Sequence, residues 1–133
     1  MKFSPAPDIS ENIFKICEKL KFFHIDAKRI VCYRSTGSSS RAIARIWSLP
    51  KIWQDALKIK PHYVLEVISE KFDRQPEDEK IKIMIHELMH IPKNFSGAVL
   101  SHSRSQFDGA GGFVKKKIDA RSVEKLFEEF KRN

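Results

Sequence analysis

The chain has 133 residues, of which 41% are hydrophobic and 32% are charged, the balance of an ordinary soluble protein. This length supports one hydrophobic core, so we expect a single domain over residues 1–133. No apolar run is long enough to cross a bilayer and residues 1–7 lack the apolar stretch of a signal peptide, which predicts a cytoplasmic protein with no membrane partner. Cys17 and Cys32 are too few for a disulfide framework, so we expect buried, reduced thiols.

The first third of the chain predicts a helix followed by a β-hairpin. The helix is expected to run from a cap at Asp8 or Ser10 to about Phe22, with an apolar stripe that packs on a sheet. Residues 30–33 and 42–47 are rich in β-branched and aromatic side chains, and a small polar turn separates them. These two segments therefore predict a pair of neighbouring strands.

The middle of the chain predicts a short helix and one well-marked strand. Residues 49–57 predict a helix whose apolar side chains, Trp53 among them, belong to the core. Residues 63–68 predict a strand with Glu66 on an otherwise apolar face, where we expect it to pair with an arginine of the neighbouring strand. A strand at this point in the chain is expected to line a cleft and to offer its backbone to an extended peptide.

The strongest functional signal is an H-E-x-x-H motif formed by His86, Glu87 and His90. Pro76, followed by three acidic residues, predicts the start of a helix, and Pro92 predicts its end. Residues four apart on a helix lie on the same face about 6 Å apart, so the two imidazoles can bind one metal ion. Zinc suits this arrangement, because a catalytic zinc site combines three protein ligands with one water.

A third ligand must come from later in the chain. His102 lies twelve residues after the motif, close enough for a returning loop to bring it under the helix. Glu124, Asp108 and Asp119 are the competing ligands, although imidazole is the commonest neutral ligand of zinc. The glycine-rich segment 106–113 predicts a loop at the rim of the site, and Asp119 is expected to cap a closing amphipathic helix.

This motif, together with residues 91–97 and His102, resembles a small archaeal and phage-type family of zinc metallopeptidases. The similarity also includes residues 39–47 and 67–74, so it extends over most of the chain. The resemblance implies an α+β, single-domain zincin-like fold, in which a small mixed sheet packs on helices, an edge strand borders the cleft and one helix presents the motif. It also implies that His102 is the third zinc ligand.

More distantly, the order of strand, H-E-x-x-H helix and later histidine is similar to that of SprT-like proteases, which cleave proteins crosslinked to DNA. No separate zinc ribbon or DNA-binding tail is visible in this chain. The metzincin pattern is not met, because Lys93 and Ser96 stand where that pattern requires glycine and histidine. The metzincin class is therefore excluded.

We predict a zinc metallopeptidase that hydrolyses peptide or protein substrates. His86, His90 and His102 would hold the ion, and Glu87 would act as general base and later pass the proton to the leaving amine. Three residues are candidates for stabilising the oxyanion: Tyr63, Arg104 and Arg45. The alternative is a zinc-containing, nucleic-acid-associated binding module without peptidase activity, which the net charge of +8 permits.

Overall fold

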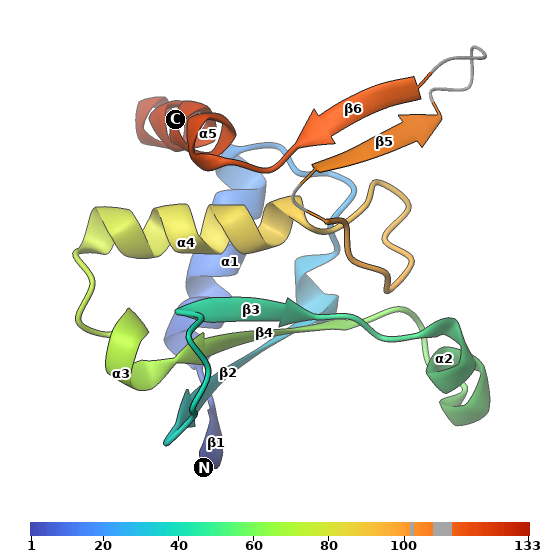
Figure 1. Ribbon diagram of the computed structural model, residues 1–133, viewed down its shortest axis with the longest axis horizontal. Helices are drawn as coiled ribbons and strands as arrows, with labels where there is room; N and C mark the ends of the chain where they lie inside the picture. The colour runs from blue at the N-terminus through green and yellow to red at the C-terminus, as the bar shows by residue number, and fades with distance from the viewer. Residues whose placement is uncertain (102, 108–112) are drawn as a thin grey trace.

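The computed structural model describes the backbone of residues 1–101, 103–107 and 113–133, and the side chains of residues 1–101 and 118–133. This part of the chain contains five α-helices and two β-sheets (Figure 1). The helices are α1 (Pro7–Lys19), α2 (Lys51–Leu57), α3 (Ser69–Phe72), α4 (Glu77–Met89) and α5 (Ala120–Arg132). The strands are β1 (Lys2–Pro5), β2 (Ile30–Thr36), β3 (Ala44–Trp47), β4 (Tyr63–Ile68), β5 (Ser103–Phe107) and β6 (Phe113–Lys117).

The larger sheet is mixed and has the strand order β1-β2-β4-β3. Its central strands, β2 and β4, run parallel, whereas β1 and β3 pair antiparallel at the two edges. Strands β5 and β6 form a separate antiparallel pair. The predicted α+β class, with a small mixed sheet packed on helices, is confirmed. None of the described helices is long and apolar enough to cross a membrane.

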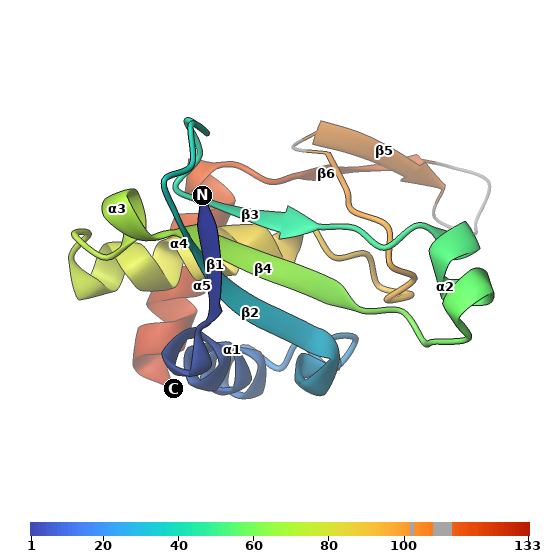
Figure 2. The same cartoon turned by 90° about the horizontal axis from the view of Figure 1, so that it is seen from below.

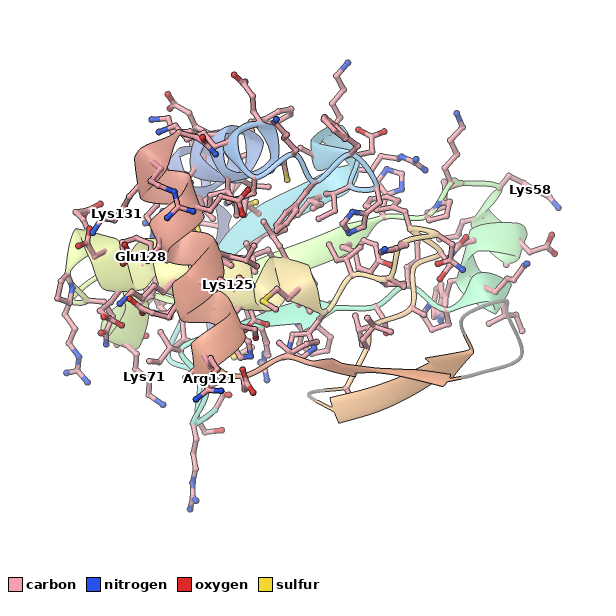
Figure 3. All side chains as sticks on the ribbon, turned by 90° about the horizontal axis from the view of Figure 1, so that it is seen from above. Lys58, Lys71, Arg121, Lys125, Glu128 and Lys131 are labelled. Carbon is pink, nitrogen blue, oxygen red and sulfur yellow. The ribbon has the colours of Figure 1, made fainter. Side chains whose placement is uncertain are left out.

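Helices α1, α4 and α5 lie together on one side of the larger sheet (Figure 1). The core between these helices and the sheet includes Ile9, Ile13, Ile16, Ile30, Leu65, Val67, Met84, Ile85 and Leu88. Each such side chain contributes about 1.5–3 kcal/mol when it is removed from water. The outer side of α5 is charged and carries Arg121, Lys125, Glu128 and Lys131 (Figure 3). Both cysteines are free, buried thiols, as predicted.

The predicted pairing of the strands at 30–33 and 42–47 is wrong, because β4 lies between β2 and β3. The helix-facing side chains of β4 are almost wholly buried, with Leu65 and Val67 both 0% exposed, which favours a central position for this strand. A central strand has no unpaired backbone to offer a peptide, so the prediction for residues 63–68 is also corrected. The edge strand that borders α4 is β3.

Helix α2 forms where the sequence predicts it, but its side chains do not enter the core. Ile52 and Trp53 are 76% and 57% exposed. The helix projects beyond the end of the sheet, with Lys58 at its far tip (Figures 1 and 3). Hydrogen bonds attach this helix to the rest of the protein: Gln54 Nε2 donates to the carbonyls of Leu49 and Ser96, each at 2.8 Å. The segment is apolar and helical, as predicted, but none of the described elements covers its apolar side chains.

The N-terminal region differs from the prediction in its caps and in one strand. Helix α1 begins at Pro7 without a side-chain cap and ends at Lys19. Asp8 instead accepts a 2.6 Å hydrogen bond from Arg34 of β2. Residues Lys2–Pro5, which were not predicted to form a strand, pair with β2 because the chain before Pro7 is extended and β2 has an open edge.

Candidate active site

Helix α4 holds the H-E-x-x-H motif at its C-terminal end, as predicted. Three acidic residues occupy its first turn, where they favour the positive end of the helix dipole. Met84, Ile85 and Leu88 are buried and fix the helix against the core. Because these positions set the rotation of the helix, the motif residues point toward the edge strand β3.

The two histidines lie one helical turn apart, with ring centroids separated by 5.1 Å. His90 is buried, and its Nδ1 donates a hydrogen bond to the carbonyl of Leu100. The Leu100 amide in turn donates to the carbonyl of His90 at 2.7 Å. With the proton on Nδ1, the Nε2 atom of His90 carries the lone pair, which is the state a metal ligand requires.

Glu87 is buried beside this pair, with 7% of its surface exposed. One carboxylate oxygen lies 3.4 Å from His86 Nδ1. Burial raises the pKa of Glu87 from its ordinary 4.5 to about 7, and a hydrogen bond from the backbone of Ile46 in β3 opposes part of that rise. A carboxyl group with a pKa near neutrality can both accept and return a proton at physiological pH.

Strand β3 and helix α4 line a depression of ≈ 420 Å³ that contains His86, Glu87 and His90. No described strand pairs with β3 on the side facing away from β4. The Ile68 amide donates to the carbonyl of Ile43 at 2.8 Å, and paired residues alternate along antiparallel strands. Ala44 therefore presents its N–H and C=O groups outward, and Ile46 presents its C=O outward while its N–H is bound to Glu87. Outward backbone groups are what the edge of a cleft needs to bind an extended chain.

Of the four candidates for the third metal ligand, two lie outside the described residues and two are bound to other side chains or to the backbone. His102 and Asp108 lie outside the described residues. Asp119 caps α5, where its Oδ1 accepts the Ser122 amide at 2.9 Å, as predicted for this residue. Glu124 forms a 2.9 Å ion pair with Lys82. Within the chain as described, no group of three His, Cys, Asp or Glu residues that could hold a metal ion is formed.

Two of the three oxyanion candidates have other roles. The Tyr63 hydroxyl donates to the carbonyl of Ala98 at 2.7 Å and accepts the Gly97 amide at 2.9 Å, so it fixes the loop after α4. Arg45 turns to the opposite face of the sheet and binds Glu66 at 2.8 Å, the pairing predicted for that glutamate. The side chain of Arg104 lies outside the described part of the chain.

Two backbone groups that matter to the site were not predicted from the sequence. They are the carbonyl of Leu100, which orients His90, and the amide of Ile46, which reaches Glu87. Every residue carries such groups, so no residue type marks them. The nearest usable signal was the β-branched pattern of residues 42–47, which predicted the strand but not its partner.

Comparison with known proteins agrees with the motif. A family model described as "Putative phage metallopeptidase" matches residues 1–132. The chain belongs to this family. Membership supports a metal-dependent peptidase as the general class, and a peptide or protein as the substrate, without identifying the metal or its ligands. No curated protein and no solved structure matches the chain, so the similarity to SprT-like proteases stays a prediction.

Proposed function

We propose that this phage metallopeptidase family member is a zinc-dependent endopeptidase, acting as one domain over residues 1–133, with His86, His90 and His102 as zinc ligands and Glu87 as general base. One observation carries the proposal: a buried carboxyl group with a pKa of about 7 lies directly beside two histidines one turn apart. A purely structural zinc site needs no such carboxylate.

The residues present fit a zinc ion. Two imidazoles on one helical face supply nitrogen donors, and the Leu100 carbonyl holds His90 in the tautomer that coordinates through Nε2. Asp119 and Glu124 are already bound to Ser122 and Lys82, which supports His102 as the third ligand. When bound, zinc supplies Lewis acidity, which lowers the pKa of water toward about 7 and polarises a carbonyl group.

The protein's own groups provide the proton transfers. Glu87 accepts the proton of the attacking water on its carboxylate and then donates it to the nitrogen of the leaving amine. The same burial that raises its pKa excludes bulk water from the carboxyl group, so the proton stays available for the second transfer. The Ile46 amide keeps the carboxylate aimed along β3.

The substrate is an extended peptide that pairs with the outer edge of β3. Ala44 would exchange two hydrogen bonds with it and the Ile46 carbonyl would accept a further one, which places one peptide bond across the depression beside Glu87. Such pairing recognises the backbone of the substrate and not its side chains. It therefore predicts endopeptidase activity on unfolded or extended segments rather than on one fixed sequence.

The test combines metal content with proteolysis. Zinc per chain is measured for the wild type, His90→Ala, His102→Ala and, as a matched control, His62→Ala, since His62 lies outside the site and is bound to the Lys60 carbonyl. We expect about one zinc in the wild type and in the control, and a sharp loss in the other two. Full zinc in His102→Ala would reject His102 as a ligand, and casein cleavage by metal-free protein would reject the metal-dependent mechanism.

A further inference from the structure

The face of the sheet opposite α4 and α5 carries a group of aromatic side chains. Strand registers place Phe3 of β1, Tyr33 of β2, Val64 of β4 and Trp47 of β3 on this face, where they line a depression of ≈ 400 Å³. Phe3 is 60% exposed and Trp47 is 49% exposed. No described helix crosses the front of β2, β4 or β3 on this side (Figure 2).

Hydrogen bonds to a buried glutamate hold Trp47 and Arg45 in place on this face. Glu66, 1% exposed, lies at the floor of the depression, and its Oε1 accepts hydrogen bonds from Arg45 Nε and Trp47 Nε1, both at 2.8 Å. The Arg45 guanidinium also stacks on Trp47, with Cζ 4.8 Å from the ring centroid. Burying a carboxylate is costly, and here the buried Glu66 fixes an exposed indole and a partly buried guanidinium before any partner arrives.

The charges on this face favour an anionic partner. Among the strand residues whose side chains lie on it, the one carboxylate is Glu66, which is buried and paired with Arg45. Arg45 uses Nε for that pair, and its two terminal nitrogens make no hydrogen bond to any described residue. A planar fork with free donors suits a phosphate group. The net charge of +8 disfavours a second copy of the chain and attracts a polyanion.

We propose that this face binds single-stranded nucleic acid, with bases stacked on Phe3, Tyr33 and Trp47 and a backbone phosphate bound by Arg45. Bases of any sequence stack on an aromatic platform, whereas the bases of a duplex are already stacked on one another. The site lies on the opposite face of the sheet from Glu87 and does not depend on the proposed peptidase activity.

The test measures fluorescence anisotropy of a labelled oligothymidylate of about 15 nucleotides, with the corresponding duplex in parallel. Phe3→Ala and Trp47→Ala should each raise the Kd about 5-fold or more, since stacking of one base is lost. Two matched controls make the same changes elsewhere: Phe23→Ala, because Phe23 is 87% exposed, and Trp53→Ala on α2. Both controls should leave the Kd unchanged.

A second readout follows Trp47 directly. In a Trp53→Phe background Trp47 is the one remaining tryptophan, and a stacked base should quench its emission on binding. Arg45→Gln should lower the slope of log Kd against log salt by about 0.7, the value for one phosphate contact on a single strand.

Several results would overturn the proposal. They are absence of binding at about 100 µM protein and low salt, equal affinity for the duplex, and binding that Phe3→Ala and Trp47→Ala leave unchanged. The last result would place any nucleic acid elsewhere on the basic surface. A chain that dimerises, and that Phe3→Ala makes monomeric, would assign this face to a second copy instead.

Discussion

Glu66 and Glu87 are both buried glutamates, 1% and 7% exposed, and both take a hydrogen bond from strand β3. Their pKa values nevertheless move in opposite directions. Burial alone would raise the pKa of Glu66, but polar contacts with Arg45, Ser35 and Trp47, together with the charge of Arg45, hold it below its ordinary value. Among the described side chains no lysine or arginine forms an ion pair with Glu87, and its pKa rises to about 7.

The difference shows what decides the role of a buried carboxyl group. Where a cation neutralises it, as at Glu66, the group stays ionised and positions its neighbours. Where the neighbours are a backbone amide and an imidazole, as at Glu87, the group exchanges a proton near neutral pH. Successive residues of β3 supply the two environments, because Arg45 and Ile46 face opposite sides of the sheet.

Glu87→Gln is the change with the largest expected effect on this comparison. Glutamine keeps the shape of the side chain and its acceptor oxygen but cannot take a proton, so kcat/KM on a peptide substrate should fall about 100-fold or more while the zinc content stays the same. Glu77→Gln, the same change at an exposed position of α4, is the control and should retain full activity. Retained proteolysis in purified Glu87→Gln would exclude Glu87 as the base.

The same substitution should lower activity but raise the stability of the metal-free protein at alkaline pH. Folding raises the pKa of Glu87 from 4.5 to about 7. The folded protein therefore keeps its full stability below pH 4.5, where Glu87 is neutral in both states, and loses stability as the pH rises through 7. Glu87→Gln removes this penalty, and above pH 8 the variant should be more stable than the wild type by up to about 3 kcal/mol.

Urea unfolding at pH 5 and pH 8 in the presence of a chelator measures this effect. The two proteins should differ little at pH 5, where Glu87 is mostly protonated in the folded wild type. If wild type and Glu87→Gln were equally stable at both pH 5 and pH 8, the carboxyl group would be hydrated in the folded protein. The contrast with Glu66 would then disappear.

The comparison also separates what the sequence predicts from what it does not. The motif helix was predicted almost to the residue, because its spacing and flanking prolines are local features of one segment. The partner of β3 was not, because strand pairing depends on residues far apart in the chain and β4 enters between two strands that are consecutive. The orienting carbonyl of Leu100 is a backbone group of the loop after α4 and has no sequence signal of its own.

Arg45→Met tests the environment of Glu66, the second glutamate of the comparison. The variant keeps an unbranched apolar stem but removes the cation, so Glu66 is left buried with only part of its hydrogen bonding, at a cost of about 1–3 kcal/mol near pH 7. Because the folded pKa of Glu66 is depressed, the stabilisation is complete above pH 4.5 and is lost as the pH falls below it. Denaturant unfolding should therefore show the gap between wild type and variant closing in acid. A gap independent of pH would assign the loss to packing on Trp47.

The smallest effect is expected at α2, where sequence pattern and structure disagree most. Trp53 is 57% exposed and lies on a helix that projects from the sheet, so Trp53→Ser should change the free energy of unfolding by no more than about 0.5 kcal/mol. Leu88→Ala, at a position 0% exposed on α4, should cost about 2–5 kcal/mol in the same assay. If the two losses proved similar, Trp53 would be covered in solution, and the apolar pattern of residues 49–57 would have predicted a buried helix correctly.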